Sequence, residues 1–140
     1  MLKVGDIFGP SSWIEIPQSR IDAFAEATGD HQWIHVDPDR AKDGPFGSTI
    51  AHGYLTLSLI PFASYQVVPR REGGMGINYG LNRVRFTSPV PVDSRVRVSF
   101  EVLEVEEIKG GSQTTMSATV EREGGDKPAC IAEVVFRHYE

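Results

Sequence analysis

The segment IAHGYLTLSLIPFASYQVV, residues 50–68, decides the fold of this chain, because it is the most apolar stretch of the sequence. Its large side chains point to every side of a helical wheel: Tyr54, Leu55, Leu57, Leu59, Ile60 and Phe62. A helix that is apolar on all sides must be enclosed by the rest of the protein. The apolar run is interrupted by His52, Gly53, Pro61 and Gln66, so it is too short to span a membrane. We therefore predict a buried central helix, which requires a sheet wrapped around it.

The second half of the chain begins with the alternation of a half-buried strand. Residues 94–107, SRVRVSFEVLEVEE, place apolar and polar side chains on opposite faces. The apolar face carries Val96, Val98, Phe100 and Val102. Such a face packs well against the apolar central helix.

Three further segments complete the predicted sheet. Residues 114–123 repeat the alternation, EGGDK at 123–127 forms a hairpin turn, and residues 129–139 form a last strand. An earlier strand is expected within 77–86, where Gly80 marks a bulge or a close approach of two backbones. The sequence thus predicts an α+β chain that ends in an antiparallel meander.

A short amphipathic helix is predicted ahead of this core. In IPQSRIDAFAEATGD, residues 16–30, apolar residues recur at helical spacing after Pro17, and Gly29 ends the helix. Asp37 and Pro38 then start one helical turn, and the glycines and proline of 44–47 break it up.

Composition places the 140 residues in one globular domain, residues 1–140. The net charge of -5, without a basic cluster, argues against binding to nucleic acid. The single cysteine, Cys130, cannot form an internal disulfide and is expected to be buried. The first 13 residues have no apolar core of signal-peptide length, so we expect a cytoplasmic protein.

The segment ATGDHQWIHVD, residues 27–37, concentrates the titratable side chains. Asp30 and His35 would lie on different faces of a helix, since five residues rotate by about 500°, and only a turn can bring them together. A carboxylate and an imidazole that share one water can remove one proton and deliver another, as the addition of water to an activated double bond demands. Each residue also has a plain structural interpretation, Asp30 as a turn residue and His35 as a satisfied, partly buried histidine.

Gly53 is the candidate electrophilic group. It lies where the central helix begins, so its unpaired backbone N–H could polarise a carbonyl oxygen, and the missing side chain permits close approach of a ligand. Alternatively, it only eases the loop into the helix.

A metal site is a competing chemical interpretation. His31 and His35 have the i, i+4 spacing of two helical ligands, with Asp30, Asp37 or His52 as a third. The helix break at Gly29 argues against it, and we predict no metal.

These residues resemble a known family. FAEATGDHQWIHVDPDRA, residues 24–41, is similar to the signature of the MaoC-like R-specific enoyl-CoA hydratases, in which Gly-Asp-x-Asn-Pro-(apolar)-His is followed by Ala/Val-His-Gly at the start of a central helix. Together with AHGYLTLSL and INYGLNRVRFTSPVPVDSRVRV, it looks closest to the nodulation protein N-like branch, which includes 3-hydroxyacyl-thioester dehydratases. The resemblance extends from about Val4 to His138.

The resemblance implies a hotdog fold, in which a curved antiparallel sheet wraps one long helix, and a homodimer. The family's catalytic aspartate and histidine fall on Asp30 and His35, and its oxyanion-hole amide on Gly53. Its asparagine is replaced by Gln32, which could help to orient the water on a longer arm. Its proline is replaced by Trp33, which could shape the acyl pocket or pack in the core, and we expect it in the core.

The implied reaction is the reversible hydration of a trans-2-enoyl thioester to the R-3-hydroxyacyl thioester, without metal or organic cofactor. Asp30 is assigned as the base and His35 as its partner in holding water and moving a proton. The thioester carrier is coenzyme A or an acyl carrier protein. Coenzyme A is polyanionic, and Arg83 and Arg85 are candidates for contacting its phosphates; the alternative is that they only form a solvated face. The alternatives are a hotdog thioesterase and a non-catalytic acyl-thioester-binding module.

Overall fold

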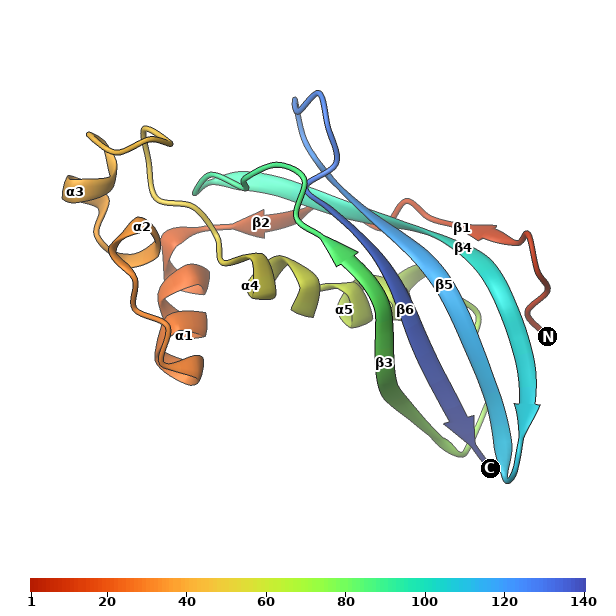
Figure 1. Cartoon of the computed structure of the whole chain (residues 1–140). Helices are drawn as coiled ribbons and strands as arrows, with labels where there is room; N and C mark the ends of the chain where they lie inside the picture. Colours follow the sequence, from red (N-terminus) through yellow and green to blue (C-terminus); the bar gives the residue numbers. More distant parts are fainter.

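A computed structural model describes residues 1–140. Six strands form one antiparallel sheet, and the helices lie on its concave side or beyond its end (Figure 1). The strands are β1 (Ile7–Phe8), β2 (Ile14–Ile16), β3 (Met75–Arg85), β4 (Ser94–Ile108), β5 (Gly111–Arg122) and β6 (Cys130–Tyr139). The helices are α1 (Gln18–Thr28), α2 (Trp33–Val36), α3 (Pro38–Ala41), α4 (Gly53–Ser58) and α5 (Ile60–Val67). This is the hotdog arrangement, and the predicted fold class is confirmed.

The sheet follows the order β1-β4-β5-β6-β3, and β2 also pairs with β4. Val98 of β4 pairs with Val120 of β5, which places apolar residues of neighbouring strands on the same concave face. The expected irregularity at Gly80 is present, because the register between β3 and β6 shifts between Asn78 and Gly80. The short strands β1 and β2 were not predicted, since two or three residues are too few for a periodic signal.

The core lies between the concave face and the central helical segment. The side chains of Val96, Val98, Phe100 and Val102 are buried there, as the alternation predicted. Cys130 is buried as well, and burial raises the pKa of its thiol to about 11. The thiol is therefore a packing group rather than a nucleophile at neutral pH.

The central helix differs from the prediction in two ways. It is divided into α4 and α5 at Leu59, because Pro61 has no N–H to donate and its ring crowds the carbonyl of Leu57. It is also not enclosed on all sides: 70% of Tyr54, 50% of Phe62 and 61% of Tyr65 are exposed. The sheet of one chain covers only one side of this apolar helix.

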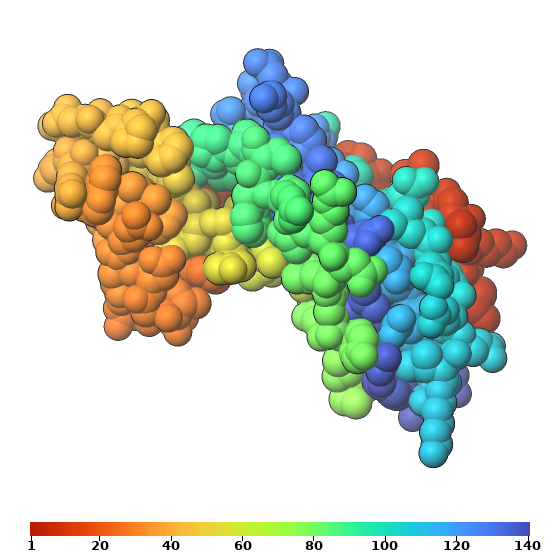
Figure 2. All heavy atoms as spheres, viewed as in Figure 1, coloured from red at the N-terminus to blue at the C-terminus, as the bar shows by residue number.

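Residues 17–49, with α1, α2 and α3, form a lobe that projects beyond the end of the sheet (Figures 1 and 2). The predicted helix end is confirmed, because Gly29 adopts a left-handed conformation (φ 86°) and its N–H donates to the carbonyl of Ala25. Trp33 is half-buried in this lobe, beneath the guanidinium of Arg40 at 4.2 Å, so its expected place in the core was wrong. Neither this lobe nor the rest of the chain has a helix that is long and apolar enough to cross a membrane.

Candidate active site

The segment between α1 and α2 brings Asp30 and His35 together. The left-handed Gly29 turns the chain out of α1, and the Gln32 N–H donates to Asp30 Oδ1 at 3.3 Å. The four-residue helix α2 then carries His35 back towards Asp30. The turn that the spacing required is therefore present.

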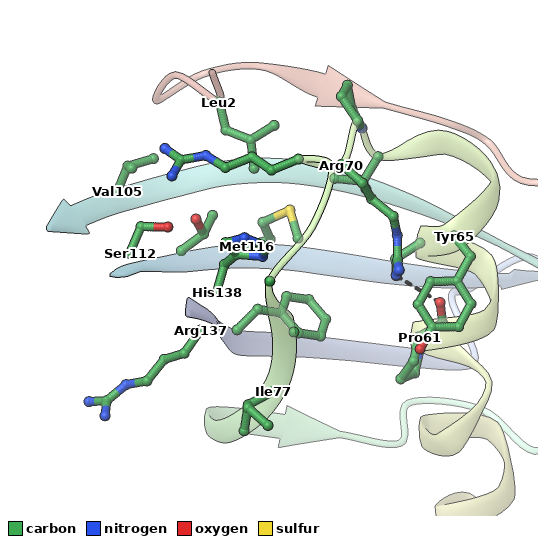
Figure 3. Close-up of a pocket in the computed structure, with 18 of the residues that line it drawn as sticks. Leu2, Pro61, Tyr65, Arg70, Ile77, Val105, Ser112, Met116, Arg137 and His138 are labelled. Carbon is green, nitrogen blue, oxygen red and sulfur yellow. Dashed lines mark hydrogen bonds between the residues drawn. The ribbon is translucent and has the colours of Figure 1, made fainter. Parts of the chain in front are cut away.

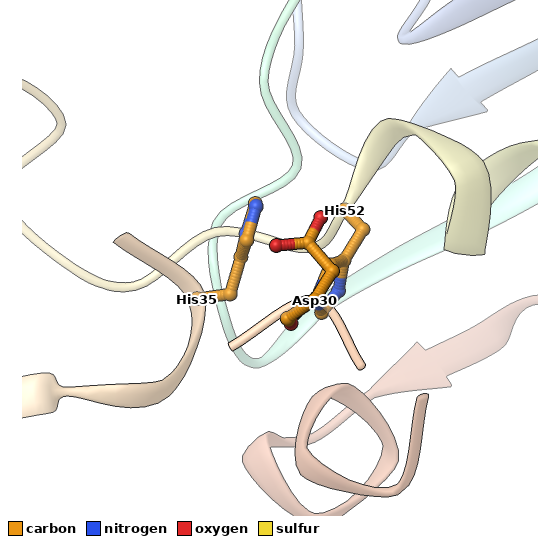
Figure 4. Close-up of side chains that lie close together, drawn as sticks. All are labelled: Asp30, His35 and His52. Carbon is orange, nitrogen blue, oxygen red and sulfur yellow. The ribbon is translucent and has the colours of Figure 1, made fainter. Parts of the chain in front are cut away.

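Three side chains converge at this point: Asp30, His35 and His52 (Figure 4). One carboxylate oxygen and one ring nitrogen of each histidine lie within 4.8 Å of one another. Asp30 is exposed, whereas the histidines are buried, with 7% and 2% of their surfaces accessible. The cluster is therefore open to solvent on the side of Asp30 and buried on the side of the two histidines.

The hydrogen bonds of His35 fix its tautomer. Its Nδ1 lies 2.7 Å from the carbonyl oxygen of Ile50, which can only accept, so Nδ1 carries the hydrogen and Nε2 is left as an acceptor. Burial is the main cause that lowers the pKa of His35 below its ordinary value of 6.5, and His52 lowers it further. The hydrogen bond to Ile50 and the charge of Asp30 oppose this shift. The net effect favours a neutral imidazole that can take up a proton near neutral pH.

Gln18 fixes the backbone behind His35. Its amide donates to the carbonyl of His35 at 2.7 Å and to the Asp22 carboxylate at 2.9 Å, and its oxygen accepts from the Thr49 hydroxyl at 2.6 Å. Three segments are thereby joined at one amide. Sequence reasoning missed Gln18 and Thr49, because a polar residue in the first turn of a helix carries no signal of so distant a partner.

His52 is the third residue of the cluster and was considered only as a metal ligand. Its ring stacks on that of His35, with centroids 3.9 Å apart and planes inclined by 23°. Its Nε2 donates to the backbone carbonyl of Asp30 at 3.0 Å, and its Nδ1 is buried without a partner.

Gly53 follows directly as the first residue of α4, so its N–H has no acceptor within the helix and donates to no other protein group. A Cβ at this position would lie 3.0 Å from the ring of Phe86, closer than carbon atoms normally pack. The close packing against Phe86 therefore favours glycine here.

The cluster fits a metal ion poorly. The lone pair of an imidazole nitrogen lies in the plane of its ring. The rings of His35 and His52 are stacked 3.9 Å apart, so their lone pairs do not point to a common position. Tetrahedral zinc requires such a position, about 2 Å from both nitrogens. His31 and His35 do not share one helix, as two helical metal ligands would, because His31 lies between α1 and α2. The Nε2 of His31 lies 3.3 Å from the carboxylate of Glu26. The Asp37 side chain caps α3.

The remaining sequence candidates lie outside the cluster. Gln32 contacts Asp30 through its backbone, and its side chain makes no hydrogen bond. Arg83 and Arg85 are exposed on β3, and Arg85 donates to the carbonyl of Val84. The structure thus joins Asp30 and His35 directly and Gly53 through its chain neighbour His52, but it does not join the two arginines to them.

Two cavities are open to a ligand. The smaller, of about 300 Å³, is lined by residues that include Ile50, Gly53, Thr56 and Phe86. The larger, of about 500 Å³, lies between the end of α5 and the far halves of the strands (Figure 3). Its wall includes Met116 and Phe136 but no residue of the cluster. Neither cavity is lined by Asp30, His35 or His52, but the smaller one includes Ile50, whose carbonyl accepts from His35, and Gly53, which follows His52 in the chain.

A carboxylate, an imidazole with a free ring nitrogen and a free backbone amide, carried on a hotdog fold, are groups that can add water to an activated acyl group or remove it. The profile of the MaoC-like domain matches residues 3–124, and the chain belongs to this family.

Curated relatives agree with this assignment. The chain is 53% identical to 3-hydroxyacyl-thioester dehydratase Z of Mycobacterium tuberculosis over 96% of this chain and 89% of that protein. It is 51% identical to nodulation protein N of Rhizobium leguminosarum bv. viciae over 93% of this chain and 83% of that protein. Among solved structures, unliganded R-hydratase PhaJ1 from Pseudomonas aeruginosa is 29% identical, covers 99% of this chain and 83% of its own, and has a TM-score of 0.80.

Proposed function

We propose that this chain is an R-specific enoyl-thioester hydratase that adds water reversibly to a trans-2-enoyl thioester and forms the R-3-hydroxyacyl thioester. The observation that carries the proposal is the convergence of Asp30 and His35 with His52, the residue that precedes the free amide of Gly53. The names of the dehydratase and R-hydratase relatives support the same reaction.

In the proposed hydration, Asp30 and His35 hold one water between the carboxylate and Nε2. Asp30 takes a proton from the water while the oxygen of the water forms a bond to C3. The electrons of the double bond move to the thioester oxygen, which gives an enolate. The proton that Asp30 took is then delivered to C2 with the help of His35, so that one water is added in total and Asp30 is a carboxylate again. Protonation of His35 in advance would impair this step, because Nε2 could then no longer accept a hydrogen bond from the water.

The Gly53 N–H is proposed to donate to the thioester oxygen. Negative charge grows there in the transition state, and a preorganised donor at such a position contributes about 3 kcal/mol. The thioester is proposed to enter the smaller cavity, since Gly53 and Ile50 both line it.

The carrier is proposed to be coenzyme A or an acyl carrier protein, and the reaction needs no cofactor, because water and the enoyl group supply all the atoms. Arg83 and Arg85 stay predicted contacts of the carrier phosphates. A single domain over residues 1–140 and a cytoplasmic location likewise stay predictions from composition.

We infer a homodimer from the apolar surface that the chain leaves open. The strand β3 is an edge of the sheet, and it exposes Met75, Ile77, Tyr79 and Leu81. The uncovered side of α4 and α5 exposes Tyr54, Phe62 and Tyr65. An apolar edge strand beside an apolar helix face is suited to a second copy, which would continue the sheet and cover the helix.

The reaction is tested with crotonyl-CoA and longer trans-2-enoyl-CoA substrates. We expect loss of the enoyl absorbance, formation of the R-3-hydroxyacyl product on chiral analysis, and no release of free coenzyme A. Release of the thiol would identify a thioesterase instead. Binding of the thioester without turnover would identify a non-catalytic module.

A further inference from the structure

His52 touches both members of the catalytic pair without offering a reactive atom to either. Its Nε2 bonds the backbone carbonyl of Asp30 and not the carboxylate. Its ring lies against the face of His35, whereas the proton-carrying nitrogens lie on the ring edge. His52 therefore touches groups that do not change during the proposed reaction.

The backbone around Asp30 has few other restraints. Residues 29–32 lie outside helices and strands, and the Asp30 side chain accepts only the 3.3 Å bond from Gln32. The bond from His52, by contrast, is 3.0 Å long and comes from a residue that is only 2% exposed. The ring of Phe24 lies 4.9 Å from that of His52 and limits its movement.

We propose that His52 is a positioning residue that holds Asp30 and His35 in register with the amide of Gly53, the next residue in the chain. The proposal rests on the proposed hydratase function. One side chain thus joins the water-binding half of the site to its carbonyl-binding half. A displacement of about 1 Å between such halves costs about 100-fold in rate.

Two substitutions distinguish the hydrogen bond from His52 to the Asp30 carbonyl from the simple filling of space by the His52 side chain. In His52→Gln, the amide nitrogen can occupy the place of Nε2 and donate to the Asp30 carbonyl, whereas in His52→Asn the shorter side chain reaches only as far as Nδ1. His31→Asn is the matched control, because His31 is an exposed histidine near Asp30 that contacts only Glu26.

We expect kcat to fall about fivefold in His52→Gln and about 30-fold or more in His52→Asn, with KM within about twofold of wild type in both. His31→Asn should match wild type. Thermal unfolding verifies that each variant is folded at the assay temperature. Equal kcat in the Gln and Asn variants, or a loss confined to KM, would overturn the proposal.

Backbone NMR relaxation provides a reading that does not depend on turnover. The amide order parameter of Asp30 should be about 0.85 in wild type and in His52→Gln, as in rigid backbone. It should fall below about 0.6 in His52→Asn, as in flexible backbone. An unchanged order parameter in His52→Asn would refute the positioning role even if kcat fell. An inactive wild type would refute the hydratase function instead, and the order parameters would still decide whether His52 holds Asp30.

Discussion

The Nδ1–H of His35 donates to the carbonyl oxygen of Ile50 over 2.7 Å, and this single bond turns Nε2 towards the catalytic cluster. Ile50 belongs to the segment that enters α4, two residues before His52. The same backbone segment therefore fixes the tautomer of His35 and leads into the central helix.

The acid limb of activity should reflect the lowered pKa of His35. Because burial lowers this pKa below 6.5, the neutral imidazole is the major form at pH 6.5, and protonation becomes dominant only at lower pH. We expect kcat/KM for crotonyl-CoA to be lost with an apparent midpoint below pH 6.5. NMR of the imidazole nitrogens should show His35 titrating there, and a His35 midpoint above 6.5 would contradict the site geometry.

The free energy of unfolding, like the activity, should fall as the pH falls. His35 has a lower pKa in the folded state than in the unfolded state, so the unfolded chain binds more protons between the two values. The His35 contribution to the free energy of unfolding is therefore present above pH 6.5 and is lost as the pH falls through the folded pKa. Urea unfolding at a series of pH values should show a shallower decline in His35→Gln than in wild type. Parallel curves would mean that His35 contributes nothing.

A methyl group at position 53 should disturb both packing and catalysis. In Gly53→Ala the new Cβ meets the Phe86 ring at 3.0 Å, so the free energy of unfolding should fall by about 1–3 kcal/mol. A shift of the amide should also lower kcat by about tenfold or more. The double variant Gly53→Ala/Phe86→Leu should recover part of both losses, because the smaller side chain relieves the contact. Full activity in Gly53→Ala would contradict the close packing at this amide.

The exposed helix face should control assembly. Light scattering on the wild type should give twice the chain mass of 15.5 kDa. Phe62→Glu places a charge in the middle of the exposed apolar face and should shift the protein towards the monomer. Leu103→Glu is the control, since Leu103 is also exposed but lies on β4, away from that face. A wild type with the mass of one chain would rule out the dimer.

Much of the fold could be predicted because its signals are local. The alternation in β4 and β5 and the glycine that ends α1 each act within a few residues. The break at Leu59 was missed because the apolar character of the segment outweighed Pro61. The enclosure of the helix was predicted too strongly, since a sequence shows that a surface is apolar but not whether the same chain covers it.

The site divides in the same way. Asp30 and His35 could be paired from the turn between them, and Gly53 from its place at a helix start. Gln18 and His52 could not be found in this manner, because their partners lie 17 and 22 residues away and only the tertiary fold joins them. Trp33 was misplaced because a large aromatic residue is usually buried, whereas here it packs against Arg40 in the projecting lobe.

The central claim is that one water is activated jointly by Asp30 and His35. The most direct measurement is kcat for hydration of crotonyl-CoA by wild type, Asp30→Asn and His35→Ala, with circular dichroism and thermal unfolding on the same preparations. We expect each folded variant to lose activity by about 100-fold to 10,000-fold, because the loss of either group removes proton transfer to or from the reacting water. A folded Asp30→Asn or His35→Ala variant with the kcat of wild type would contradict the claim.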